Sequence, residues 1–289
     1  MNTTAITAEL PRPRRRTSMW PRLVSAELLK VRKRRGLVIS ALVLTVAPMI
    51  LAYTVLVGLH ASDPVKNGPA GGTENFVGSM SVLWGLCVVA AILVGATIGT
   101  GDLGAGVFRE LVVTGRSRLA LFAARVPAGL ALLLPIVGMA FAITAAASIV
   151  LAGSKQAGWV RVGPGAREFK LGDVAPSASL LIESAGWLML VTALTFLLAL
   201  GVASLLGSRG TSIGILLGWW LVVMPLLLTF EPLGSVRKGL SWAAIEELAP
   251  DTVLEPTAPM SRATAVTVLL AWTAAPLALG AWRTCTRDA

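Results

Sequence analysis

The sequence predicts an all-α, polytopic membrane protein with six transmembrane helices. Of its 289 residues 55% are hydrophobic and 14% are charged, whereas charged residues make up about a quarter of an average soluble domain. Six long stretches contain no Asp, Glu, Lys or Arg: 36–62, 75–101, 126–154, 184–208, 210–230 and 263–282. Each reaches the ~20 residues that a helix needs to cross a bilayer. A soluble globular domain is therefore excluded.

The chain ahead of the first stretch divides into a tail and a helix. We expect residues 1–17 to form a disordered basic tail, because prolines and three consecutive arginines fill residues 10–16. Residues 18–289 then form a single six-helix transmembrane domain. An apolar stripe at helical spacing predicts an amphipathic helix lying on the inner membrane surface and ending at Gly36; a plain basic flank is the alternative. The stripe consists of Trp20, Leu23, Val24, Leu28 and Val31.

The distribution of charge predicts the orientation. Six spans place both termini on one side, and the polar segments on that side carry more than twice as many Lys and Arg residues as those on the other side. The positive-inside rule therefore places both termini in the cytoplasm. The net charge of +10 then indicates contact with anionic lipids, and nucleic acid is not an expected partner.

Several residues predict how the spans pack. Pro48, Pro127, Pro135, Pro225 and Pro276 interrupt helical hydrogen bonding and predict bends. A strip of small residues in the second span predicts close helix packing, either within the chain or across a dimer; it contains Ala91, Gly95 and Gly99.

The tryptophans and the last outer loop give two more predictions. Trp159, Trp187, Trp242 and Trp282 fall near the expected membrane interfaces and suit an aromatic belt, whereas Trp84, Trp219 and Trp220 fall deeper and suit packing. Residues 240–248 favour a short helix on the outer surface, ended by Pro250.

The sequence lacks the residues that ion-coupled transport or catalysis requires. Ion-coupled carriers need ionisable groups inside the membrane, and the nearest, Glu183, falls at the outer end of the fourth span. His60 has no potential metal ligand at a suitable spacing. The chain contains no Gly-Lys dipeptide, which excludes a Walker A loop. Gly99 to Gly104 matches a dinucleotide pattern only by coincidence, since it leaves a membrane span. We expect no catalytic residue, cofactor or metal, and no enzymatic activity.

The segment 102–125, which joins the second and third spans, is cytoplasmic in this topology. Val107, Phe108, Leu111 and Val112 form an apolar stripe at helical spacing, and Gly115 favours a helix end. This pattern predicts a short cytoplasmic coupling helix fixed between two spans. Two roles fit it: a handle for a moving partner, or a helix lying on lipid.

The order of these features resembles the type-2 ATP-binding-cassette permeases. The resemblance is carried by the basic amphipathic stretch 25–36, the glycine-rich exit from the second span, and an Arg-x-Leu-x-x-Thr-Gly-x-Ser-Arg string beginning at Arg109. The layout extends over nearly the whole chain. Many members have an acidic residue and a threonine directly ahead of that arginine, whereas this chain has Gly106, Val107 and Phe108.

The resemblance implies the membrane subunit of a bacterial exporter in the plasma membrane. Such a permease pairs with a second permease chain, identical or different, and binds cytoplasmic ATPase subunits that hold the ATP and Mg. The implied ATPase-coupling surface comprises Phe108, Arg109, Glu110, Leu111, Thr114, Arg116 and Arg118. Two alternatives are an ion-independent secondary transporter and a non-transporting membrane scaffold or sensor. The apolar spans do not specify a substrate.

Overall fold

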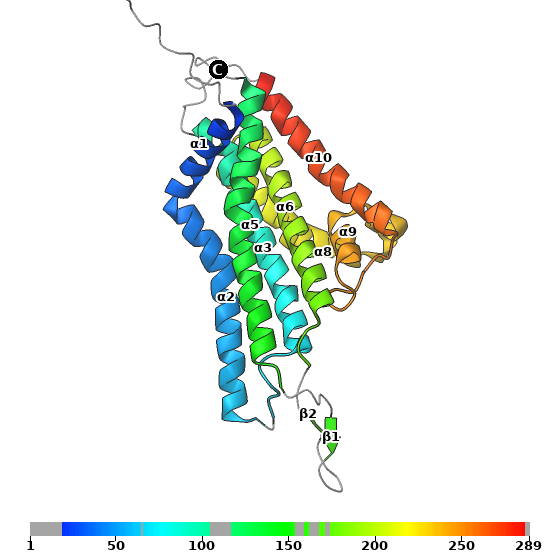
Figure 1. The fold of residues 1–289 in the computed structure, drawn as a ribbon. Coiled ribbons are helices and arrows are strands. Elements are labelled where there is room, and N and C mark those ends of the chain that lie inside the picture. Colours follow the sequence, from blue (N-terminus) through cyan, green and yellow to red (C-terminus); the bar gives the residue numbers. More distant parts are fainter. Residues whose placement is uncertain are drawn as a thin grey trace, which may run out of the picture.

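The computed structural model describes residues 19–64, 66–104, 117–153, 159–161, 168–170 and 174–286, so the predicted tail lies outside the described residues. Helices dominate this part of the chain (Figure 1). Six helical segments are long and apolar enough to span a membrane, which confirms the predicted number. They are Arg35–Ser62, Thr73–Gly101, Arg118–Val150, Ala178–Leu206, Arg209–Thr229 and Arg262–Thr286. A short antiparallel hairpin, β1 (Trp159–Arg161) and β2 (Glu168–Lys170), was not predicted.

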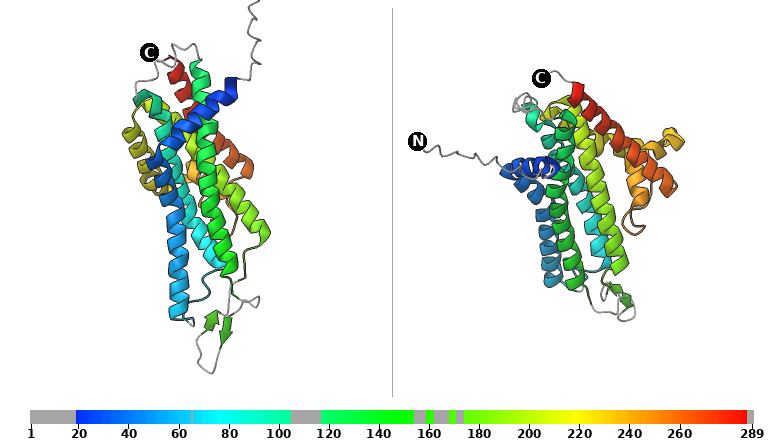
Figure 2. Two further views of the ribbon diagram at one scale, coloured as in Figure 1. Left: turned by 60° about the vertical axis from the view of Figure 1, so that its left-hand side comes forward. Right: turned by 45° about the horizontal axis from the view of Figure 1, so that its top comes forward.

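The amphipathic helix ahead of the first span is confirmed as α1 (Met19–Lys33), but its end is not where the sequence predicted. The helix breaks at Arg34, and α2 (Arg35–Ser62) begins directly after it. A Cβ atom on Gly36 would meet no atom within 4 Å, so this glycine is not needed for the turn. The left view in Figure 2 shows α1 running obliquely across α5 (Arg118–Val150), which it contacts.

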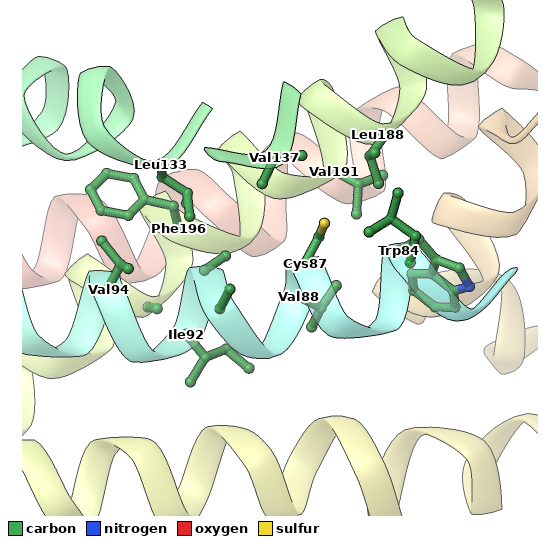
Figure 3. Close-up of a cluster of buried hydrophobic side chains, with 14 of the residues drawn as sticks. Trp84, Cys87, Val88, Ile92, Val94, Leu133, Val137, Leu188, Val191 and Phe196 are labelled. Atoms are coloured by element: carbon green, nitrogen blue, oxygen red, sulfur yellow. The ribbon is translucent and has the colours of Figure 1, made fainter. Parts of the chain in front are cut away.

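Two helices fill the centre of the bundle. In the most apolar 18 residues of α3 (Thr73–Gly104), 72% are buried inside the protein, and in those of α6 (Ala178–Leu206) 56%. The corresponding share is only 22% in α2 and in α10 (Arg262–Thr286). Figure 3 shows the core between α3, α5 and α6, where large apolar side chains interlock. They include Trp84, Val88 and Val94 from α3, Leu133 and Val137 from α5, and Leu188, Val191 and Phe196 from α6.

The small-residue strip of the second span packs within the chain. A Cβ atom on Gly95 would lie 2.7 Å from the Phe196 carbonyl oxygen, and one on Gly99 would lie 2.8 Å from that of Leu200. Both distances are too short for a real Cβ atom, so α6 approaches α3 closely only because glycine stands there. The structure thus assigns this strip to the α3–α6 contact.

The fifth span is helical throughout but contains a widened turn. It consists of α7 (Arg209–Gly218), a π-helical segment η1 (Trp219–Val223) and α8 (Met224–Thr229). Pro225 has no N–H group, and its ring crowds the carbonyl one turn earlier. The helix adapts through a hydrogen bond from the Met224 N–H to the carbonyl of Trp219, five residues back. Pro225 is therefore preceded by a π turn, and the bend expected there stays a prediction.

The loop between the fifth and sixth spans contains the predicted short helix, but that helix is not on the protein surface. After the 3-10 segment η2 (Glu231–Gly239), α9 (Ser241–Leu248) packs into the bundle with Ala243, Ala244 and Ile245 buried. The indole Nε1 of Trp187 donates to the Ile245 carbonyl oxygen at 3.0 Å. The expectation of a surface helix is wrong because this loop folds back against the spans.

Trp84, Trp187, Trp220 and Trp242 form one cluster, which we call the indole cluster. Neighbouring ring centroids lie 5.0 to 6.1 Å apart, in the range of favourable aromatic pairs. The expectation of an aromatic belt is therefore wrong for Trp187 and Trp242, which pack against protein. Trp282 is 64% exposed, as a belt residue would be, and the side chain of Trp159 lies outside the described residues.

Candidate functional site

The structure describes the two ends of the predicted coupling segment. Arg118 is the first residue of α5, and the other predicted coupling residues lie outside the described residues: Phe108, Arg109, Glu110, Leu111, Thr114 and Arg116. The segment 105–116 leaves α3 after Gly104 and is followed by Ser117, which caps α5. The candidate site is therefore built from the exit of α3 and the start of α5.

The start of α5 is fixed by two hydrogen bonds. The Ser117 hydroxyl oxygen accepts from the Ala120 N–H at 3.2 Å, as an N-cap residue does. Arg118 Nη1 donates to the carbonyl oxygen of Cys285, in the last turn of α10, at 3.1 Å. Carbonyls at a helix C-terminus lack partners and carry partial negative charge, so a guanidinium stabilises them. The predicted coupling residue Arg118 thus ties α5 to the end of α10.

The helix α1 packs on the same end of α5. Leu23 is buried against Leu121 and Ala124 of α5. Of the predicted membrane-surface residues, Leu23 and Val31 are buried in protein, Val24 and Leu28 are partly buried, and Trp20 is 46% exposed. Contact of this helix with lipid stays a prediction, and the structure adds a protein contact that the stripe alone did not reveal.

Arg125 was expected in the cytoplasmic loop, and the structure corrects this placement. The helix α5 starts seven residues earlier, at Arg118, so Arg125 lies inside it and is only 1% exposed. Its Nη1 donates to the carbonyl oxygen of Gly99 in α3 at 3.3 Å. The same oxygen has a longer contact, 3.4 Å, with the hydroxyl of Ser204 in α6, which also donates to Leu200 at 2.8 Å. Three helices therefore meet at one carbonyl.

A second arginine reaches α3 from the other side. Arg34, at the α1–α2 junction, has its Nη1 3.5 Å from the Thr97 carbonyl oxygen. A Cβ atom on Gly101 would lie 3.1 Å from Nη2 of Arg34, so the glycine lets the guanidinium rest on the helix backbone. We call Arg34 and Arg125, with Thr97 and Gly99, the arginine clamp.

The arginine clamp is suited to hydrogen bonding with the α3 backbone, and not to proton transfer or metal binding. The arginine side chain has N–H donors and no acceptor, so it offers no lone pair to a metal ion or to an incoming proton. Its N–H groups instead bind backbone carbonyl oxygens of α3, those of Thr97 and Gly99. Among the described residues, no cluster of three or more His, Cys, Asp or Glu side chains could hold a metal ion.

The opposite ends of α3 and α6 border an open cavity of about 470 Å³. Thr73 begins α3 and Ser177 caps α6, and Glu183 and Asp251 add carboxylates to the lining. Glu183 is exposed, as expected for a solvated carboxylate at the end of a span. The central helices therefore link the arginine clamp at one end with this cavity at the other.

Sequence reasoning identified the segment around the site but missed the clamp. Arg125 directly precedes a charge-free stretch, and a guanidinium in that position usually faces the interface. The available signal was the apolar spacing of Leu121 and Phe122, which extends the helix back through Arg125. The sequence matches no family model and no curated protein.

Proposed function

We propose that the chain is the membrane-spanning permease subunit of an ATP-binding-cassette exporter in a bacterial plasma membrane. In this proposal, separate cytoplasmic ATPase subunits bind ATP and Mg and act on the segment 105–116. The observation that carries the proposal is the mounting of this segment between α3 and α5. Because α3 fills the centre of the bundle and contacts α2, α5, α6 and α7, a displacement of its exit acts on the whole core.

The charges within the spans support an external source of energy. Among the described residues of the six candidate spans, Arg125 is the one charged side chain that is buried. Carriers driven by protons or sodium place ionisable groups in the membrane to bind the coupling ion. An arginine side chain has donors but no acceptor, so it offers no binding site to a coupling cation. In this proposal, ATP hydrolysis by a docked ATPase supplies the energy for transport.

Each predicted coupling residue has a role in this proposal. Phe108 and Leu111 enter an apolar groove of the ATPase, with Glu110 and Thr114 beside them. Arg109 and Arg116 pair with acidic groups at the rim of that groove or with lipid phosphate. Arg118, through its bond to Cys285, joins the surface to α10. A second permease chain and anionic lipids complete the proposed assembly.

The test is co-purification from native membranes, using the double variant Phe108→Ala, Arg109→Ala. The matched control is Val236→Ala, Lys238→Ala, because both residues are exposed in η2, away from the coupling segment. We expect a P-loop ATPase to co-purify with the wild-type chain and the control but not with the double variant.

Three results would contradict the proposal. If the double variant captured the ATPase normally and showed normal ATP-dependent efflux, the surface around Phe108 and Arg109 would have no coupling role. Transport in ATP-depleted vesicles would favour a secondary transporter. Capture of a protein without an ATPase fold would favour a scaffold or sensor.

A further inference from the structure

We infer that Arg125 is a positioning residue that joins the exit of α3 to α5 and α6, so that these helices move together with the coupling segment. The inference rests on the proposed function and deepens it. It assigns the step between the ATPase contact and the membrane core to one buried side chain.

The burial of Arg125 needs an explanation beyond packing. Removing a guanidinium from water is costly unless hydrogen bonds replace the lost hydration. A leucine or methionine would fill a similar volume without that cost. At 1% exposure, Arg125 is also closed to lipid headgroups and to a docked protein. Its function must therefore be directed at its neighbours inside the bundle.

Arg125 binds the backbone of α3, a partner that no side-chain substitution in α3 can remove. Its Nη1 donates to the Gly99 carbonyl oxygen at 3.3 Å, five residues before the helix ends at Gly104. Gly99 also lets α6 approach, since a Cβ atom there would lie 2.9 Å from the Cβ atom of Ala203. Arg125 therefore holds α3 at the point where α6 is already in backbone contact.

This arrangement carries displacement along the molecule. The helix α3 contains 32 residues and is about 48 Å long at 1.5 Å per residue. Its first residue, Thr73, lines the open cavity at the far end. Tightly packed helices shift as bodies rather than deform continuously. With Arg125 in place, a displacement of residues 105–116 moves the whole of α3 and so changes that cavity. Without Arg125, only the C-terminal end of α3 is displaced.

The experiment uses the full chain with its captured ATPase in liposomes and needs no known substrate. A single reporter cysteine, Ser179→Cys, replaces an exposed residue that lines the cavity, in a Cys87→Ala, Cys285→Ser background. Its reaction rate with a water-soluble maleimide is compared without nucleotide and with ATP plus vanadate. The variants are Arg125→Met and Arg125→Lys, and Arg22→Met, an exposed arginine of α1, is the matched control.

We expect the labelling rate to depend on nucleotide in the wild-type chain and in Arg22→Met. Arg125→Met should abolish this dependence while ATPase binding and vanadate trapping persist, and Arg125→Lys should restore part of it because lysine keeps one charged donor. A nucleotide response in Arg125→Met equal to that of the wild type would overturn the inference. So would a wild-type rate that nucleotide does not change.

Hydrogen exchange of the chain alone separates this inference from the proposed function. Losing the bond from Arg125 should speed amide exchange in the last turn of α3 roughly tenfold or more, and unchanged exchange would overturn the inference. Should Arg125→Met not fold, Arg125→Lys decides by the same two measurements, and wild-type values in both reject the role. If no ATPase binds the wild-type chain, the proposed function fails whatever the exchange shows.

Discussion

The contact between α3 and α6 gives a quantitative test of the fold through the substitution Gly99→Ala. The added Cβ atom would lie 2.8 Å from the Leu200 carbonyl oxygen and 2.9 Å from the Cβ atom of Ala203. Ordinary van der Waals contact of a Cβ atom begins at 3.4 Å, so the two helices must separate by several tenths of an ångström. Overpacking of this kind costs about 1–3 kcal/mol.

The matched control is Gly85→Ala in the same helix, where a Cβ atom would meet nothing within 4 Å. Because alanine favours helix over glycine, the control should be neutral or more stable by up to about 1 kcal/mol. Unfolding of the purified protein by sodium dodecyl sulfate, followed by tryptophan fluorescence, gives both free energies. Equal stability of the two variants would refute the close approach of α6 to α3 at Gly99.

Three further substitutions test other contacts. Trp187→Phe leaves the buried Ile245 carbonyl without its 3.0 Å donor, so the free energy of unfolding should fall by about 1–3 kcal/mol; Trp282→Phe, at an exposed site, should leave it unchanged. Glu246→Gln weakens the acceptor for Trp242 Nε1 and the Thr257 N–H, and faster proteolysis of the loop 249–261 should follow. Arg118→Ala removes the bond to Cys285, and amide exchange in the last turn of α10 should rise severalfold; unchanged exchange there would show that this bond does not hold the helix end.

The spans could be predicted from the sequence because the bilayer imposes a simple condition on long helices. A stretch of about 20 residues without charge is rare in a soluble domain and sufficient for a span, so composition alone decides the number. The ends of the helices were less certain. The start of α5 was missed because Arg125 is charged, whereas in the structure its guanidinium lies inside the bundle and donates to the Gly99 carbonyl oxygen.

In the loop between the fifth and sixth spans, the sequence predicted the helix but not how deeply it is buried. The apolar spacing of residues 240–248 correctly predicted α9, since helical periodicity is a local property. The prediction that α9 lies on the surface was wrong, because its burial involves a distant residue. The indole of Trp187 in α6 donates to the α9 backbone from 58 residues away in the sequence. The hairpin of β1 and β2 was also missed, since strands of three residues are too short to show an alternating pattern.

The indole cluster is an intrinsic spectroscopic probe of conformation. Its rings come from α3, α6, η1 and α9, and the closest pair, Trp84 and Trp242, has centroids 5.0 Å apart. Indoles at such distances couple electronically, which produces strong near-ultraviolet circular dichroism and mutual quenching. A movement that draws α9 away from α3 alters both signals, so conformational changes of the unlabelled protein can be followed spectroscopically in real time.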